Sequence, residues 1–219
     1  MGSRAIVRGV HSNLGVYLHY DGYYDSVRAL TQYCKLKGYR SPEADSYGIA
    51  RLAQVCGNFF RGGLSVGIEY LPDSMLTAEI VESYQLNNGI YELKDWEIFA
   101  HWNSDLVLAA DEADPDFDYD GYLLEIDRRM PFREQLGADF IFGKEVPVKS
   151  LKIGDEVFIR SFEEIEKFKV EGIASPGTLV QGVDVGGLPY VNALKESKCI
   201  GEYLAEYLRT DTVRIAKKH

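Results

Sequence analysis

The sequence predicts an α+β protein in which helices pack on a largely antiparallel sheet, with a smaller α+β part at the C-terminal end. Three observations predict this class. Residues 5–10 are a short apolar run interrupted by Arg8, and residues 14–20 alternate between apolar and other side chains, which is typical of strands. Apolar residues then recur every three or four positions up to about residue 56, as in helices, and alternate again from residue 64. Strands and helices that follow one another in blocks favour α+β over a regular βαβ repeat.

A β-hairpin is expected at the beginning of the chain. Residues 5–10 form its first strand, because they are apolar apart from Arg8, and residues 14–20 form its second, because their apolar positions alternate. Ser12-Asn13 lies between them and is a favourable turn sequence. Asp21-Gly22 then ends the second strand.

Two helices are expected after this hairpin. The inward positions of the first helix are Tyr24, Val27, Leu30 and Cys34. Gly38 is placed to end it. Ser41-Pro42-Glu43 is a favourable helix start, with Ser41 as the N-cap residue, and the second helix is expected to end at Cys56.

The middle of the chain predicts an antiparallel meander over roughly residues 64–127. The strongest signal is Asn87-Asn88-Gly89, because Asn-Gly favours the tight turn of a hairpin. The expected strands are residues 64–71, 79–86, 90–93, 95–102 and 122–126.

A domain boundary is expected within residues 137–147, which Gly143 and Pro147 interrupt. We therefore predict an N-terminal domain over residues 1–143 and a C-terminal α+β subdomain over residues 144–219. In the C-terminal subdomain, Ser161 and Glu164 form a capping box, which predicts a helix that begins there and ends near residue 168. The other expected elements are a strand within 148–160, loops over 172–187, a helix over 190–208 and a strand over 212–216.

The negative charge of the chain is concentrated in one place. The 219 residues include 34 acidic and 24 basic side chains, which gives a formal net charge of −10. Residues 111–120 contain six of the acidic residues and no basic one, so the other 209 residues carry only −4. A sequence pI near 4.9 argues against sequence-independent binding to nucleic acid and against a polybasic membrane site.

The compartment is expected to be the cytoplasm. Cys34, Cys56 and Cys199 are widely spaced and form no Cys-x-x-Cys motif, so the sequence does not indicate a zinc site. The first residues lack the apolar run of a signal peptide, and no stretch has the length and apolar character of a membrane span.

The chain begins with Ser3-Arg4-Ala5 in the first expected strand and reaches His19-Tyr20-Asp21-Gly22-Tyr23 just before the first expected helix. This arrangement, over about the first 35 residues, resembles small proteins encoded by bacteriophages and related mobile elements. Those proteins usually have proline where this chain has Tyr24. The family has no established activity, so the resemblance implies a phage or mobile-element origin and no particular chemistry.

A second resemblance lies in residues 151–168. Gly154-Asp155 forms an expected turn, a strand follows, and Ser161 begins an expected helix. This segment is similar to a part of phage proteins that builds a small SH3-like barrel, and the resemblance implies such a barrel in the C-terminal subdomain.

The acidic segment contains a partial calcium-binding pattern. Asp116, Asp118, Asp120, Gly121, Leu123 and Asp127 match positions 1, 3, 5, 6, 8 and 12 of a calcium loop. Position 12 is Asp127 rather than the longer Glu, and Arg128-Arg129-Met130-Pro131 is a poor exiting helix. The alternative is an acidic surface loop before a strand, and we expect this alternative, with no metal and no cofactor.

The same carboxylates could bind another protein. In an extended loop, every second side chain lies roughly 6.6 Å from the next on one face, which is comparable to the spacing of DNA phosphates. Such a row could occupy a basic nucleic-acid groove of a host protein, and tyrosine is common at binding surfaces. The expected partner-binding residues are Asp111, Glu112, Asp114, Asp116, Asp118, Tyr119, Asp120 and Tyr122.

An enzymatic interpretation remains open. His19 and Asp21 are two residues apart on an expected strand, so their side chains can share a face and act as a general base. The other interpretation is a structural junction in which Asp21 caps the first helix. No nucleophile motif, phosphate-binding loop or dinucleotide-binding motif accompanies the pair, so no catalytic residue is assigned.

These observations predict a phage accessory protein that inhibits or redirects a host protein, in the manner of an anti-CRISPR-like inhibitor. The partner would have a basic surface, as a host defence nuclease has. The alternatives are a hydrolase or nucleotide-handling enzyme that uses His19 and Asp21, and a calcium-stabilised structural module.

Overall fold

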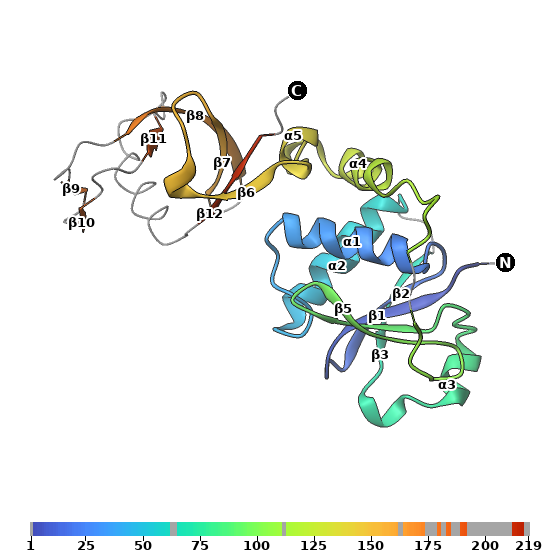
Figure 1. The fold of residues 1–219 in the computed structure, drawn as a ribbon. Coiled ribbons are helices and arrows are strands. Elements are labelled where there is room, and N and C mark those ends of the chain that lie inside the picture. Colours follow the sequence, from blue (N-terminus) through green and yellow to red (C-terminus); the bar gives the residue numbers. More distant parts are fainter. Residues whose placement is uncertain are drawn as a thin grey trace. The chain divides into compact units, whose positions relative to one another are not determined.

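A computed structural model describes residues 2–61, 65–110, 113–161, 164–173, 179–180, 183–184, 189–191 and 212–216. The chain divides into two compact units, Met1–Gln135 and Leu136–His219. The division lies eight residues before the predicted boundary at 143, so residues 136–143 belong to the second unit. Both units contain helix and strand, which confirms the α+β class (Figure 1).

The N-terminal unit contains a five-stranded sheet in the order β3-β2-β1-β4-β5. The central strand β1 pairs in parallel with β4, and the other three pairs are antiparallel. The predicted meander is therefore only partly formed, because the N-terminal strand β1 lies between β2 and β4. The strands are β1 (Ala5–Gly9), β2 (Leu14–Leu18), β3 (Val66–Tyr70), β4 (Ile90–Lys94) and β5 (Glu97–Trp102).

The predicted hairpin is present as β1 and β2. Ile6 pairs with Tyr17 and Val7 pairs with Val16, so cross-strand neighbours share a face of the sheet. At the turn, the Ser12 amide donates to the Gly9 carbonyl at 2.9 Å. This register places Ile6 and Arg8 on one face and Val7 on the other.

Two helices cover one face of the sheet (Figure 1). They are α1 (Tyr24–Leu36) and α2 (Ser46–Phe59). The first agrees with the prediction, although its N-cap is Tyr23 without a side-chain cap, so Asp21 is not a capping residue. The second begins later than predicted, because the Asp45 side chain accepts from the amides of Tyr47 and Gly48 and is the true cap.

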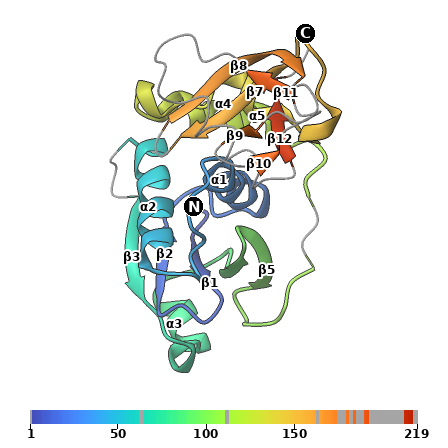
Figure 2. The same cartoon turned by 90° about the vertical axis from the view of Figure 1, so that its left-hand side faces the viewer.

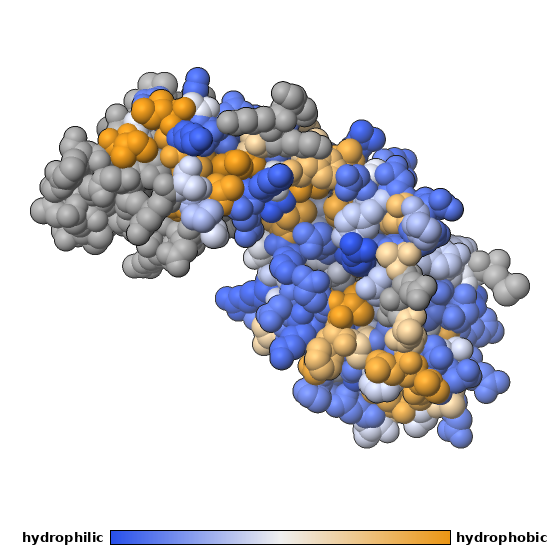
Figure 3. All heavy atoms as spheres, in the orientation of Figure 1, coloured by the Kyte–Doolittle hydropathy of each residue, from blue (hydrophilic) through white to orange (hydrophobic). Residues whose placement is uncertain are grey.

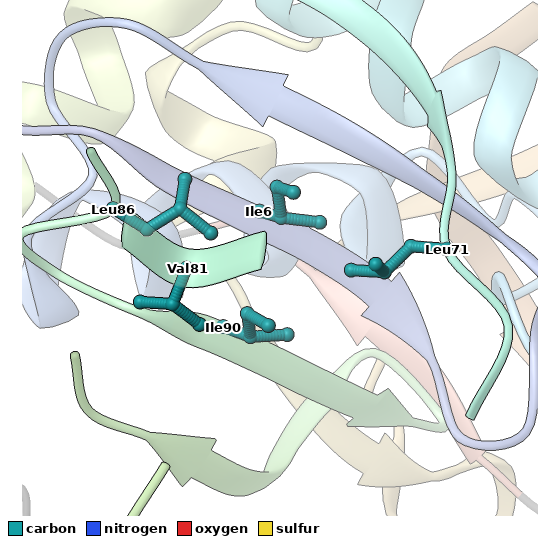
Figure 4. Close-up of a cluster of buried hydrophobic side chains, with 5 residues drawn as sticks. All are labelled: Ile6, Leu71, Val81, Leu86 and Ile90. Atoms are coloured by element: carbon teal, nitrogen blue, oxygen red, sulfur yellow. The ribbon is translucent and has the colours of Figure 1, made fainter. Parts of the chain in front are cut away.

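The opposite face is covered by α3 (Ala78–Ser83) and the short 3-10 helix η1 (Asp73–Met75). The prediction of a strand over 79–86 is wrong, because Thr77 caps a helix by accepting from the Ile80 amide at 3.4 Å. The predicted Asn-Gly hairpin is also absent, since Gly89 leads from this helix into β4. A cluster of buried apolar side chains joins α3 to the sheet, namely Ile6, Leu71, Val81, Leu86 and Ile90 (Figure 4).

A fourth helix, α4 (Tyr119–Arg129), packs against α1 and α2. The predicted strand over 122–126 is therefore wrong. Leu123, Ile126 and Met130 are buried at helical spacing, and Asp118 accepts from the Gly121 amide at 2.9 Å as the N-cap. The 3-10 helix η2 (Phe132–Glu134) follows. Figure 2 shows β3 and β5 at opposite sides of the sheet.

The C-terminal unit contains a sheet in the order β11-β8-β7-β12-β6, and all four pairings are antiparallel. Its buried apolar residues are Leu151, Val157, Ile159, Val170 and Val213. The elements are α5 (Ala138–Ile141), β6 (Lys144–Pro147), η3 (Val148–Ser150), β7 (Glu156–Ser161), β8 (Glu164–Ile173), β9 (Leu179–Val180), β10 (Val183–Asp184), β11 (Pro189–Val191) and β12 (Thr212–Ile215).

The prediction of a helix from Ser161 to residue 168 is wrong, because Ser161 ends β7 and residues 164–168 belong to β8, which pairs with β7. In β8, Val170 and Gly172 are buried while Lys169 and Glu171 are exposed, which is the period of a strand. The first two residues of the helix predicted over 190–208 belong to the strand β11, and residues 192–208 lie outside the described part of the chain.

None of the described helices has the length and apolar character needed to cross a membrane. On the face of the N-terminal unit shown in Figure 3, apolar residues gather near β5 and α3. The exposed apolar residue of β5 is Phe99, with 63% of its surface accessible.

Candidate functional site

The acidic segment, defined here as residues 113–120, presents four carboxylates to solvent. Asp114, Asp116, Asp118 and Asp120 are all exposed. Asp111 and Glu112 lie outside the described residues. The structure therefore brings four of the six predicted acidic residues together on one short stretch of the surface.

Hydrogen bonds hold the backbone of this segment. The Asp114 amide donates to the buried Asp25 carboxylate of α1 at 2.8 Å. The Asp116 amide donates to the Asp114 carboxylate at 2.9 Å. Because Asp118 caps α4, two of the four exposed carboxylates also order the local chain.

Aromatic side chains of the acidic segment and of α4 pack against neighbouring residues. The Arg28 guanidinium lies 4.5 Å from the centre of the Tyr119 ring. Burial raises the pKa of Tyr119 to about 12, although Arg28 opposes this shift. The Tyr122 ring lies 5.1 Å from that of Phe59 and 5.2 Å from that of Phe117. Both predicted partner-binding tyrosines are thus half-buried anchors of the segment.

The partial calcium-binding pattern, which the sequence offered as an alternative, does not fold into a calcium loop. Asp120 and Asp127 both belong to α4, where seven residues separate them by roughly 10 Å along the axis. Asp127 is buried and accepts from the Tyr33 hydroxyl at 2.7 Å. Within the described part of the chain, no group of three or more His, Cys, Asp or Glu side chains could hold a metal ion.

His19 and Asp21 have different neighbours. The Nδ1 atom of His19 lies 3.1 Å from the Tyr17 hydroxyl and 3.4 Å from the Arg4 Nε. Asp21 has a positive φ of 54° and lies beside Tyr122 and Arg129. Burial raises the pKa of its carboxyl, and the Tyr122 hydroxyl and Arg129 oppose that shift. The described contacts therefore place His19 and Asp21 in two different groups of side chains, and not in the general-base pair that the alternative interpretation requires.

Sequence reasoning missed the group that His19 does join, which we name the Arg4 cluster: Arg4, Tyr17 and His19. It lies on the α3 face of the sheet at one end of β1 and β2. The alternation of β2 places Tyr17 and His19 on one face. The register of β1 against β2 adds Arg4, since Ala5 pairs with Leu18.

A second polar group on the same face is a buried ion pair. Arg8 is 1% exposed, and its Nε donates to the Glu92 carboxylate at 3.1 Å. Its guanidinium also donates to the Leu71 carbonyl at 2.9 Å and to Asp73 at 2.6 Å. The Trp102 indole donates to Glu92 at 2.9 Å. The burial of Arg8 and Glu92 indicates a role in joining the strands.

No family model matches this chain, no curated protein matches it, and no solved structure matches its fold. The geometry thus defines an α+β protein with a mixed sheet, an ordered acidic segment and a half-buried Arg-Tyr-His cluster.

Proposed function

We propose that this protein is a non-enzymatic interaction protein whose acidic segment binds a basic surface of another protein. The observation that carries the proposal is the exposure of Asp114, Asp116, Asp118 and Asp120 on a segment held by its own hydrogen bonds. A surface that is ordered before binding loses little conformational entropy when a partner docks.

Charge density, rather than a regular row of charges, is the feature a partner would recognise. Asp118 and Asp120 lie at the start of α4, so the segment is not one extended strand with evenly spaced carboxylates. Complementary charge accelerates association and selects partners of opposite charge. Binding through this segment should therefore weaken as the salt concentration rises.

The resemblance of the first 35 residues to phage and mobile-element proteins supports a host protein as the partner. A host defence nuclease has a basic groove that holds nucleic acid, and an acidic surface can compete for such a groove. The proposed role is therefore that of a phage accessory protein that inhibits or redirects a host protein.

The test replaces Asp114, Asp116, Asp118 and Asp120 with Asn and compares the proteins that co-purify from a host lysate. Asn keeps the capping and turn hydrogen bonds of Asp while removing its charge, so the segment should stay folded. The matched control removes four exposed charges elsewhere in the same unit, in the variant Glu79→Gln, Glu82→Gln, Asp95→Asn and Asp105→Asn.

We expect the control to retain the partners of the unmodified protein and the Asn variant to lose them. Both variants should unfold at about the temperature of the unmodified protein. Recovery of the same partners by the Asn variant would refute the acidic segment as the binding surface.

A further inference from the structure

The Arg4 cluster joins a cation to two other hydrogen-bonding side chains at one end of the β1–β2 hairpin. Arg4 immediately precedes β1 and contacts His19, which immediately follows β2, and Tyr17 of β2 lies two residues from His19 and contacts the same imidazole. All three side chains are half-buried. They therefore remain reachable from solvent while the sheet holds their backbone.

Arg4 has only neutral hydrogen-bond acceptors among the described residues. Its Nε points to the His19 Nδ1, its Nη1 donates to the Gln85 side-chain oxygen, and its backbone amide donates to the Asn87 side chain at 2.7 Å. By contrast, the guanidinium of Arg8 pairs with Glu92 and that of Arg129 with Glu125. The positive charge of Arg4 is therefore not neutralised by a bonded carboxylate.

Two donors in the cluster share one acceptor. The Arg4 Nε can only donate, so the His19 Nδ1 must accept from it, at 3.4 Å. The Tyr17 hydroxyl lies 3.1 Å from the same nitrogen, which has one lone pair. Burial is the main cause of a raised pKa for Tyr17, so its hydroxyl keeps its proton and can donate. An anion with several oxygens would satisfy both donors separately.

We propose that Arg4, Tyr17 and His19 bind the phosphate group of a phosphate monoester. A guanidinium binds phosphate through charge-assisted hydrogen bonds, and the phenol and imidazole add two donors beside it. The Glu69 carboxylate is the nearby opposing charge, and it is engaged by the Tyr84 hydroxyl at 2.8 Å. The Tyr20 ring, 4.6 Å from that of His19 and half-exposed, lies at the rim of the site.

The test titrates the full chain with inorganic phosphate and with AMP, and uses adenosine as the phosphate-free control. Binding is followed by calorimetry and by the NMR signals of the His19 ring. We expect both phosphate compounds to bind and to shift these signals, and adenosine to do neither. Failure of both to bind at about 10 mM would overturn the proposal.

Two variants locate the site. Arg4→Gln should weaken phosphate binding roughly tenfold or more, because the charge is lost. Arg51→Gln is the matched control, since Arg51 is exposed and, like Arg4, donates to a glutamine side chain, at 2.7 Å. Equal phosphate affinity in Arg4→Gln and Arg51→Gln would overturn the proposal.

Glu69→Gln provides the opposite change. Removal of the nearby negative charge should strengthen phosphate binding, and an unchanged or weaker affinity would argue against a phosphate at this position. The variant that carries Asn in the acidic segment should bind phosphate normally. Loss of partner binding and loss of phosphate binding are thus separate outcomes.

Discussion

At the scale of single residues, Asp127 and Asp21 show two ways in which a carboxyl group is held near α4. Asp127 is buried and accepts from the Tyr33 hydroxyl at 2.7 Å, so its desolvation is partly offset. Asp21 is half-buried with a positive φ, and burial raises the pKa of its carboxyl. The first residue should stabilise the fold through its hydrogen bond, whereas the charge of the second should weaken it.

Tyr33→Phe tests the first of these residues. The variant removes a donor to a buried carboxylate, so we expect the free energy of unfolding to fall by about 1–3 kcal/mol in urea denaturation. Tyr47→Phe is the control, because Tyr47 is 71% exposed, and it should change stability by less than about 0.5 kcal/mol. Equal effects of the two variants would contradict a stabilising Tyr33–Asp127 hydrogen bond.

Asp21→Asn tests the second. A folded-state pKa above the unfolded value means that the folded protein binds the proton more tightly, so stability falls as the pH rises through the folded-state pKa. Asn lacks this ionisation and also accepts a positive φ. We expect the variant to gain less than about 1 kcal/mol at pH 7, and this pH-dependent gain to vanish below the ordinary pKa of 3.8. If the stability gained by Asp21→Asn did not depend on pH, its cause would be the preference of Asn for a positive φ and not the loss of the ionisable carboxyl.

At the scale of the elements, the Arg8–Glu92 pair joins β1 to β4, the parallel strands at the centre of the sheet. A buried ion pair contributes little net stability, yet the loss of one partner leaves an uncompensated charge. We expect Arg8→Met, which leaves the buried Glu92 without its cation, to lower the free energy of unfolding by about 3 kcal/mol. Glu92→Met should lower it by less, because Asp73 still accepts from the Arg8 guanidinium. The double variant should lose less than the sum, and additive losses would show that the two side chains do not interact.

The elements predicted well are those in which several signals in the sequence agree. In α1 the helical period continues over 13 residues, and in the hairpin the alternation of β2 follows the turn sequence Ser12-Asn13. In α3 and α4, apolar runs such as Ile80-Val81 and Leu123-Leu124 are short and fit either period, so tertiary packing decides between helix and strand. Thr77 and Asp118 are N-cap signals that would have favoured helices at these positions.

The two candidate sites differ in how far local sequence determines them. The acidic segment is a local run of charge, so the sequence predicts its exposure directly. The Arg4 cluster depends on the register that places Arg4 opposite His19 across a hairpin, and alternation alone does not determine that register. The expectation that His19 and Asp21 share a face of one strand is wrong, because β2 ends at Leu18 and Asp21 has a positive φ of 54°.

At the scale of the whole molecule, the chain contains two units that each have their own buried apolar residues. We expect a fragment of residues 1–135 to unfold cooperatively and to reproduce the amide NMR signals of that unit in the full chain. A fragment of residues 1–117 lacks α4, exposes the faces of α1 and α2 that it covers, and should aggregate or unfold. A fragment 1–135 without cooperative unfolding would refute the independence of the unit.

The central position of β1 has a consequence during synthesis on the ribosome. Its parallel partner β4 ends at Lys94, so the sheet cannot close until about 85 residues after β1 have been made. Until then the hairpin has an unpaired edge along β1, which can pair with other chains. The nascent protein should therefore depend on chaperones most strongly in the interval between the emergence of β2 and that of β4.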